Sequence, residues 1–394
     1  MGKYADILKK NAMLIILVLV YLFFNIRTSG QMFQPMQFNA LISQNAYVYI
    51  LATGMLMCML TGGNIDLSCG SFVCFIGAIG GIMMGADPAW GQLGLGAGVS
   101  ILVMLVVGII YGCILGYLIA YVNVPPWIAT LAGYLAFRGW ATGLLTAHSQ
   151  SLSINFPEKF IKLFSGKVLS SPLGQLNIPC MVVGIIASAI VIYTVLSSRA
   201  RKIKKGYEAE TLIAAVVKIV LAVAAIMLFA YKLAMAGGIP TVLIWVVAIV
   251  LIYTFITAKT SFGRYFYTIG GNAETTRLSG VDTKKIMFLA YLNMAVLTVV
   301  TSYVVLAKLQ ASNSTVGTNY EMDAIAACVV GGVSAYGGSG KVFGMVIGAT
   351  LIGVINLGMS LMNVDANWQK VVKGVIILAA VVFDIIASKK NATK

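Results

Sequence analysis

Residues 45–84 read NAYVYILATGMLMCMLTGGNIDLSCGSFVCFIGAIGGIMM, two apolar runs joined by the short segment GGNID at positions 62–66. A helix needs about 20 consecutive apolar residues to cross a membrane, and the runs 45–62 and 66–84 are close to that length. The stretch therefore predicts two membrane helices with a glycine break between them. Short or broken helices occur where a membrane protein lines a polar cavity.

Comparable apolar runs recur along the whole chain of 394 residues, which is 60% hydrophobic and only 10% charged. A soluble domain averages about 25% charged residues, so a chain with so few charges must place much of its surface against lipid. We predict an all-α, polytopic transmembrane helical bundle that forms a single domain over residues 1–394. The twelve predicted spans are 12–26, 45–62, 66–84, 93–121, 126–146, 178–197, 211–235, 239–258, 286–307, 320–336, 342–362 and 367–387.

The basic residues predict the orientation of this bundle. If the N-terminus is cytoplasmic and the spans alternate, most of the 27 Lys and Arg fall in inside loops, as the positive-inside rule requires. Both termini are then cytoplasmic, and residues 147–177 form a long extracytoplasmic loop. The first apolar run follows Lys9-Lys10 without a small-residue cleavage site, so we expect a retained anchor. We expect no nucleic-acid partner, because no basic stripe is interleaved with exposed aromatic residues.

Two glycine series predict close helix packing. Gly108, Gly112 and Gly116 lie four residues apart, and so do Gly340, Gly344 and Gly348. This spacing places small residues on one helix face and lets two helix backbones approach each other in lipid. The second series follows another glycine-rich break at 331–340, so the two halves of the chain share a pattern of helix, break and helix. Transporters commonly contain internal repeats, with their sites at the breaks.

Asp66 is the clearest polar residue at membrane depth, because it lies at the first glycine break with Asn64 and Ser68 beside it. An ionisable side chain inside a span costs roughly 2.5–3.5 kcal/mol on insertion scales, so it usually faces inward. One interpretation is that Asp66 caps the helix that follows. The other is that it lines a transport pathway, where short polar groups donate to and accept from the hydroxyl groups of a polar substrate. The two are compatible.

Other polar residues in the spans have structural and functional interpretations too. Arg138 lines an aqueous cavity, pairs with a carboxylate or extends to the outer interface, and we favour a structural role. Glu321 and Asp323 begin a span, where carboxylates stabilise a helix N-terminus. Buried amides are placed to form interhelical hydrogen bonds. The predicted pathway residues are Asn45, Asn64, Asp66, Ser68, Arg138, Asn293, Glu321, Asp323 and Asn356.

The sequence lacks the motifs of an ATPase or another enzyme. Gly340-Lys341 is followed by Val342 and has no upstream glycine in register, so it is not a phosphate-binding loop. No HExxH, GxSxG or clustered His/Cys motif occurs, the six cysteines form no CxxC pair, and His148 lies just past a span end. We predict no catalytic residue, no metal and no cofactor in this chain. The energy for transport must come from a partner or an ion gradient.

The longest inside loop, residues 259–285, reads KTSFGRYFYTIGGNAETTRLSGVDTKK. Gly270-Gly271 predicts a break in the chain. Asn272 is placed to cap a short helix over residues 272–279, and Gly280 is placed to end it. A short helix held parallel to the membrane between two spans is a suitable lever for a cytoplasmic motor domain.

Several motifs, spread over nearly the whole chain, match one family. They are Gly263-Arg264, Gly270-Gly271-Asn272 and Arg277-Leu278-Ser279-Gly280 in the loop, Ile65-Asp66-Leu67-Ser68 with Gly70-Ser71, Phe137-Arg138-Gly139, and the run YEMDAIAA at 320–327. Together they resemble the permeases of ribose-type sugar ABC importers. Asn64, the run WQKVVKG at 368–374 and the segment 198–240, which looks like a two-span insertion, resemble the multiple-monosaccharide and xylose branch. Thr275-Thr276 and Cys69 depart from the usual alanines and valine, and the first change could alter packing against the ATPase.

The resemblance implies a homodimer in the bacterial cytoplasmic membrane with a monosaccharide pathway at the dimer axis. It also implies a separate ATPase subunit, which binds ATP and Mg²⁺ and docks at residues 264–280, and an extracytoplasmic sugar-binding protein that docks on loops such as 147–177. A nucleoside or autoinducer importer, an ion-coupled secondary transporter and a membrane-embedded enzyme are the weaker alternatives. The implied coupling residues are Arg264, Gly270, Gly271, Asn272, Glu274, Arg277, Leu278, Ser279 and Gly280.

Overall fold

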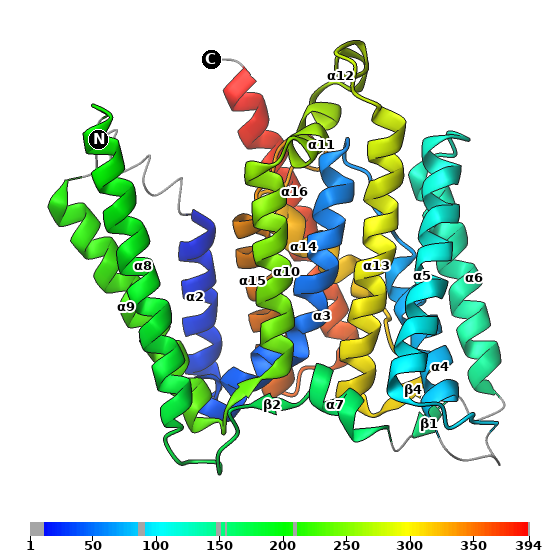
Figure 1. The fold of residues 1–394 in the computed structure, drawn as a ribbon, viewed down its shortest axis with the longest axis horizontal. Helices are drawn as coiled ribbons and strands as arrows, with labels where there is room; N and C mark the ends of the chain where they lie inside the picture. Colours follow the sequence, from blue (N-terminus) through cyan, green and yellow to red (C-terminus); the bar gives the residue numbers. More distant parts are fainter. Residues whose placement is uncertain (1–11, 86–90, 147–150, 154–155, 208–210, 393–394) are drawn as a thin grey trace.

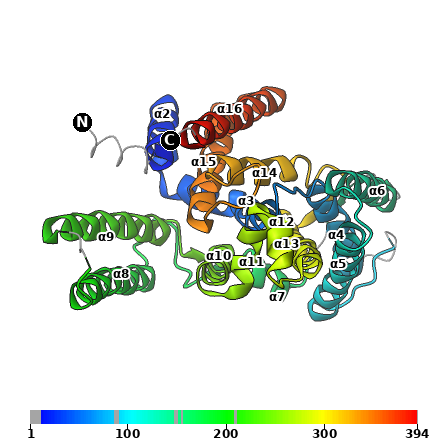
Figure 2. The same cartoon turned by 90° about the horizontal axis from the view of Figure 1, so that it is seen from above.

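The computed structural model describes residues 12–85, 91–146, 151–153, 156–207 and 211–392, and the predictions about Lys9, Lys10 and His148 lie outside them. The described chain is a bundle of helices (Figure 1; Figure 2 views it from above). In the N-terminal part the elements are α2 (Ala12–Arg27), η1 (Gln31–Phe33), α3 (Pro35–Leu60), α4 (Cys69–Met84), α5 (Ala97–Ala120), α6 (Pro126–Thr146), β1 (Ser151–Ser153), α7 (Glu158–Phe164) and β2 (Lys167–Val168). They are followed by α8 (Ile178–Lys204), α9 (Leu212–Met235), β3 (Ile239–Pro240), α10 (Thr241–Lys259), α11 (Ser261–Gly271), α12 (Ala273–Leu278), α13 (Thr283–Leu309), β4 (Ala311–Asn313), α14 (Tyr320–Val330), α15 (Val342–Leu361) and α16 (Ala366–Ala392).

Three helices form the centre of the bundle. Within their most apolar windows, 83% of α3, 72% of α13 and 67% of α15 is buried, against 28% of α5, 22% of α10, 17% of α8 and 6% of α9. The outer helices thus expose long apolar surfaces, which in a soluble protein would be an aggregation hazard. Within the described residues these seven helices are long and apolar enough to cross a membrane. The predicted all-α membrane bundle is confirmed at this level.

Each of the twelve predicted spans contains a helix, although several boundaries differ; α8, for example, continues to Lys204, seven residues past the predicted end. Helix α3 begins at Pro35, ten residues before the predicted start, because a proline in the first turn needs no hydrogen-bond acceptor for its nitrogen. Helix α14 has only 11 residues, or about 16 Å, which is too short for a hydrocarbon core of about 30 Å. The chain at 331–341 is non-helical, so the predicted span 320–336 is a half-helix that ends at a glycine turn.

Two short helices meet end to end inside the bundle. The N-terminal end of α4 abuts the turn that leads into α14: a side chain on Gly70 would collide with the Gly317 carbonyl and with the Glu321 carboxylate. Gly317 in turn has no room for a side chain against the Gly70 carbonyl. Half-helices whose N-termini converge are the arrangement from which many transporters build a central site.

Five of the six glycines in the two series lie in helices and allow close packing, as predicted, whereas Gly340 precedes α15 and is not helical. A Cβ atom on Gly112 would lie 2.8 Å from Ala295 and one on Gly116 would lie 2.8 Å from the Phe288 carbonyl oxygen, so α5 lies directly on α13. Gly344 and Gly348 face backbone carbonyl groups at the end of α14 in the same way. These contacts fix α5 against α13 and α15 against α14.

The end of the bundle opposite α12 carries the two small sheets (Figure 1). Strand β1 pairs antiparallel with β4, with Ser151 opposite Asn313, and β2 pairs with β3, with Lys167 opposite Pro240. Between them α7 buries Phe160 and Phe164 under the bundle. The described part of the predicted loop 147–177 is therefore folded against the helices.

The α8–α9 hairpin stands at the edge of the molecule (Figure 2). Its main link to the bundle is at the end away from α12, where the Lys232 amino group donates to the Phe33 carbonyl oxygen at 2.6 Å. Phe229 also packs edge-on against Phe38, with ring centroids 5.3 Å apart. The hairpin comprises residues 178–235, so the predicted insertion at 198–240 coincides with its second helix and the last turns of its first.

Candidate functional site

The first helix break is held by a chain of hydrogen bonds around Asp66, which is 1% exposed. One carboxylate oxygen of Asp66 accepts from the Ser68 backbone N–H at 2.8 Å and from the Ser68 hydroxyl at 2.5 Å. The Tyr111 hydroxyl, from α5, donates to the Ser68 hydroxyl oxygen at 2.7 Å. The predicted cap is wrong in detail: Ser68 is the N-cap residue of α4, and Asp66 closes a turn just before the helix. Its short side chain cannot reach past Ser68 to the free N–H groups of the first turn.

Asp323 joins three helices through a buried ion pair. The Lys373 amino group, from α16, lies 2.8 Å from one carboxylate oxygen of Asp323. The Tyr47 hydroxyl, from α3, donates to the other oxygen at 2.5 Å. Tyr47 also stacks on Tyr320 with ring centroids 3.8 Å apart. Asp323 lies in the first turn of α14 as predicted, but its carboxylate is used for these side chains. The sequence prediction missed Lys373 and Tyr47 as its partners.

Glu321 and Arg138 lie on either side of the meeting point of α4 and α14. One oxygen of the buried Glu321 carboxylate has no hydrogen-bond partner among the described residues, and it lies over Gly70. Arg138 donates from one nitrogen to the carbonyl oxygens of Ser314 and Val316, at 2.8 and 2.9 Å. It therefore holds the turn that leads into α14, and among the described residues it forms no ion pair. These contacts are structural, as favoured from the sequence, but donation to backbone carbonyl oxygens is none of the three arrangements predicted for Arg138.

The predicted asparagines are dispersed, and two of them link helices. The Asn45 amide donates to the Ala349 carbonyl oxygen at 2.7 Å and joins α3 to α15. The oxygen of Asn293 accepts from the Tyr253 hydroxyl and joins α13 to α10. Asn64 donates to the Thr61 carbonyl oxygen at 3.2 Å within the break. The oxygen of Asn356 has no partner in the described part of the chain. Of these four asparagines, Asn64 is the one that lies in the same break as Asp66.

The cavities beside these residues are small. One of about 70 Å³ lies next to Tyr47 and Tyr320 and also touches Lys308. Another of about 180 Å³ lies between α3, α10, α11 and α13, beside Tyr253 and Asn293. Pockets for drug-sized ligands are typically about 300–1,000 Å³. Neither of these two cavities reaches that size.

The short helix predicted at residues 272–279 exists as α12, and its predicted caps are confirmed. The Asn272 side chain accepts from the Thr275 backbone N–H at 2.9 Å, and Gly280 adopts a φ of 85° just after the helix. Glu274 and Arg277 form a two-contact ion pair with distances of 2.6 and 3.0 Å. This hydrogen-bonded contact lowers the pKa of Glu274 and raises the pKa of Arg277. Both side chains are exposed.

The tip of α12 also exposes an apolar side chain. Leu278 is 73% exposed at the far end of the molecule, and Ser279 beside it is exposed too. Thr276, one of the departures from the family pattern, is buried and donates from its hydroxyl to the Asn272 carbonyl oxygen at 2.8 Å. It therefore supports α12 from inside.

The residues before Asn272 form a helix that the sequence prediction missed. Helix α11 continues through Gly270 and Gly271, where a break was predicted, and it ends at Asn272. It buries Phe266 and Ile269 against the bundle, and Arg264 is exposed with its guanidinium 3.0 Å from the Ser261 hydroxyl. Gly270 is helical in the structure, so it does not interrupt α11. Its missing side chain instead allows α11 to approach other backbone segments closely.

Gly270 is the point where α11 contacts both helix breaks. A side chain at this position would collide with the Leu60 carbonyl, at the end of α3, and with the backbone of Gly338. The Gly338 N–H donates to the same Leu60 oxygen at 3.1 Å. The Tyr267 hydroxyl donates to the Gly340 carbonyl oxygen at 3.1 Å. Helix α11 and the two predicted breaks are therefore in direct contact with each other.

A scan of family models matches residues 37–381 to the family described as Branched-chain amino acid transport system / permease component, and the chain belongs to this family. It is 34% identical over 380 residues to the xylose transport system permease protein XylH of Haemophilus influenzae, covering 96% of each chain. It is 31% identical over 382 residues to XylH of Escherichia coli K12, covering 96% of this chain and 92% of the relative. The ribose import permease protein RbsC of the same strain is 28% identical over 345 residues, covering 87% and 84%. No solved structure gives a significant match.

These relatives confirm the resemblance to ribose-type sugar permeases that the motifs indicated. The chain is a multi-pass membrane transport subunit of the inner membrane and not an enzyme. Its long apolar helices agree with that class.

Proposed function

We propose that this chain is the membrane-spanning subunit of an ABC importer for a monosaccharide. A separate ATPase subunit, which binds ATP and Mg²⁺, docks on α11 and α12. An extracytoplasmic sugar-binding protein delivers the cargo to the opposite end of the bundle. The xylose and ribose permeases among the relatives support the cargo class.

The contact of Gly270 with both helix breaks carries this proposal. Because tightly packed backbone cannot deform gradually, a displacement of α11 is passed to Leu60 and Gly338. Leu60 is the last residue of α3, and Gly338 lies in the loop between α14 and α15. ATP-dependent movement of the docked subunit would shift the two half-helices whose N-termini meet at Gly70 and Gly317. ATP can drive this shift only if the complex binds nucleotide with different affinities in its two conformations.

The topology proposed here has twelve crossings or partial crossings in a single domain, with both termini in the cytoplasm. The start of α2 and the end of α16 lie at the same end of the bundle as α12, which supports this assignment (Figure 1). The basic residues that end α8 lie at that end too. The segment 147–177 is then extracytoplasmic and, with α7, offers a surface for the binding protein.

We place the sugar pathway between two copies of this chain. The small cavities beside Tyr47 and Tyr253 support a pathway that is completed by a second copy. Asp66, Glu321 and Arg138 flank the meeting of α4 and α14 and are its most suitable polar groups. Affinity for the sugar belongs mainly to the binding protein in this scheme.

The test is uptake of labelled xylose and ribose into proteoliposomes that contain the permease, its ATPase and its binding protein. Arg277→Glu reverses a charge on α12, and Asn272→Pro removes the cap and an N–H that donates to Thr268. Arg201→Glu makes the same charge reversal at the same end of the molecule but outside α11 and α12. We expect ATP-dependent uptake by wild type and Arg201→Glu, and its loss in the two loop variants at equal membrane insertion.

The same experiment separates the alternatives. Uptake that continues without ATP and follows an ion gradient would identify a secondary transporter and would direct attention to Asp66. ATP-dependent uptake of a nucleoside or an autoinducer with no uptake of sugars would keep the importer and change its cargo.

A further inference from the structure

The cavity of about 70 Å³ beside the stacked rings of Tyr47 and Tyr320 lies between α3, α13 and α14. Its other polar side chains are Ser43 and Gln44 from α3 and Lys308 from α13. Lys308 is in the last turn of α13, so the cavity is near the end of the bundle opposite α12 (Figure 1). In the proposed orientation this is the end at which the binding protein delivers the sugar.

Lys308 gives this cavity a positive charge that no described residue balances. Its side chain is half-buried, and its amino group forms no hydrogen bond or ion pair with any of the described residues. The Asp323 carboxylate does not balance it, because that carboxylate accepts from the Tyr47 hydroxyl and is paired with the Lys373 amino group. The three N–H donors of Lys308 are therefore available to a ligand.

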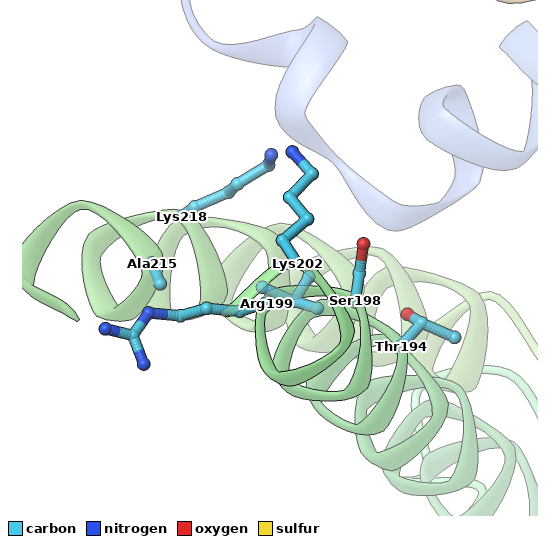
Figure 3. Close-up of a pocket in the computed structure, with 7 residues that line it drawn as sticks. Thr194, Ser198, Arg199, Lys202, Ala215 and Lys218 are labelled. Atoms are coloured by element: carbon cyan, nitrogen blue, oxygen red, sulfur yellow. The ribbon is translucent and has the colours of Figure 1, made fainter. Parts of the chain in front are cut away.

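A second basic cavity shows the difference. It has a volume of about 270 Å³ and lies between α8 and α9, with the amino groups of Lys202 and Lys218 extending to the same side of the hairpin (Figure 3). Arg199 and Lys218 of that cavity already have interaction partners. The charges of the hairpin cavity therefore do not require a ligand.

Gln44 indicates that the cavity beside Lys308 faces water and not lipid. Its side chain is exposed, although it lies about 14 Å along α3 from Pro35, where the helix begins. An amide that faces hydrocarbon without a hydrogen-bond partner is strongly unfavourable. Gln37 is exposed too and lies two helical turns before Gln44 on the same face. Polar side chains at membrane depth usually face a water-filled cavity or one another, so the two amides mark a polar path from the start of α3 to the cavity.

We propose that this cavity is the site where a sugar first contacts the permease, and that Lys308 selects uncharged sugars over amino sugars. The proposal rests on the proposed function and adds a sugar-contacting site to it. Lys308 and Gln44 donate to sugar oxygens. The Ser43 hydroxyl donates to the Asn39 carbonyl oxygen at 2.9 Å, so its own oxygen accepts from a sugar hydroxyl. Because whole small molecules occupy pockets of about 300 Å³ or more, this cavity holds one edge of the sugar.

The charge of Lys308 makes the site selective. A sugar hydroxyl accepts a hydrogen bond from the Lys308 ammonium group, whereas the ammonium group of an amino sugar is repelled by it. Fixed charges of one sign exclude ions of the same sign from membrane pathways in the same way.

The test is a saturation-transfer difference NMR titration of the purified permease in detergent micelles, with glucose and glucosamine as probes. Glucosamine carries an amino group in place of one hydroxyl of glucose, and at about pH 6 an amino group of this kind is protonated. We expect wild type to bind glucosamine at least about fivefold more weakly than glucose, which is the effect of two like charges about 4 Å apart in water. Lys308→Arg should keep this difference, Lys308→Met should remove it and Lys308→Glu should reverse it.

The matched control is Lys370→Met. Lys370 is exposed near the start of α16, at the same end of the molecule, and does not line the cavity, so this variant should bind both sugars as wild type does.

Three results would overturn the proposal. Wild type could bind glucosamine as tightly as glucose, or bind neither sugar, and Lys370→Met could act like Lys308→Met, which would mean a general effect of surface charge. Unchanged discrimination in Lys308→Met, together with lost binding of the sugar-binding protein, would assign Lys308 to a protein contact instead. Because the titration uses the permease alone and no ATP, a failure of ATP-driven sugar uptake leaves its result unaffected.

Discussion

Two ion pairs of the same chemistry lie in opposite surroundings. Asp323 and Lys373 approach to 2.8 Å with side chains 3% and 20% exposed. Glu274 and Arg277 approach to 2.6 Å with side chains 66% and 60% exposed. The first pair joins α14 to α16, which lie far apart in the sequence, and the second joins neighbours on α12. The distance between the charged groups therefore does not determine how much an ion pair stabilises the fold. Its burial and the helices that it connects decide this.

The buried pair Asp323–Lys373 stabilises the fold, whereas the exposed pair Glu274–Arg277 is accessible to a partner protein. Removing one member of a buried pair leaves an uncompensated charge in a medium that solvates it poorly. An exposed pair is solvated by water and contributes little to stability. The account therefore predicts large losses of stability at Asp323 and Lys373, and losses of transport without losses of stability at Glu274 and Arg277.

Lys373→Ala should have the largest effect on stability. We expect a decrease of about 3–5 kcal/mol in the free energy of unfolding, because the buried Asp323 carboxylate then lacks the amino group that lies 2.8 Å from it. The measurement is denaturant unfolding in detergent micelles. The control is the double variant Lys373→Met with Asp323→Leu, which removes both charges and should recover much of the loss. A double variant as unstable as Lys373→Ala would show that the charges are not what matters there.

Tyr47→Phe and Tyr49→Phe form a matched pair on α3 with smaller effects. The Tyr47 hydroxyl donates to the charged Asp323 at 2.5 Å, so its loss should cost about 1.5–3 kcal/mol. The Tyr49 hydroxyl lies 2.9 Å from the Thr350 hydroxyl, a neutral contact whose loss should cost about 0.5–1.5 kcal/mol. Equal costs in the same unfolding assay would argue that the Asp323 charge is balanced without Tyr47.

Exchanging the two charges of the exposed pair on α12 tests whether this pair contacts the ATPase. The double variant Glu274→Arg with Arg277→Glu keeps an ion pair on α12 but reverses the pattern shown to the ATPase. We expect unchanged unfolding and a loss of most ATP-dependent uptake. Restored uptake in the double variant, with both single variants inactive, would mean that the pair only stabilises α12 and does not contact the partner.

The pH dependence of the exposed pair should be the smallest effect. The hydrogen bonds from Arg277 lower the pKa of Glu274, so the pair contributes fully above the ordinary glutamate pKa of about 4.3. Its contribution is lost only as the pH falls through the lower folded value. A ¹³C titration of the Glu274 carboxylate should thus give a lower midpoint in wild type than in Arg277→Gln. Coinciding midpoints would show that the pair does not form in solution.

The sequence predicted the helices well because their apolar runs are local signals. Residues 126–146 were predicted and observed as the same helix, and the Asn272 cap and the turn at Gly280 follow from short-range rules. Helix α11 was missed because two glycines argued against it, although Phe266 and Ile269 at helical spacing could have indicated an amphipathic helix.

The partners of the polar residues could not be predicted in the same way. Tyr47 and Asp323 are separated by 276 positions, and Tyr111 and Ser68 by 43. Such pairs depend on which helices become neighbours, which periodicity within one helix does not reveal. The rule that intramembrane carboxylates are functional candidates therefore could not distinguish the ion-paired Asp323 from Glu321, which has an oxygen without a partner in the described residues.

The most direct test of the account compares Gly270→Ala with Gly271→Ala. A methyl group on Gly270 would collide with the Leu60 carbonyl, whereas one on Gly271 meets open space. The measurement is ATP-dependent sugar uptake, with binding of the ATPase subunit assayed in parallel. The account predicts that Gly270→Ala binds the ATPase but loses uptake and that Gly271→Ala retains both. If the two variants transport equally well, the contact between α11 and the helix breaks does not couple the ATPase to the pathway.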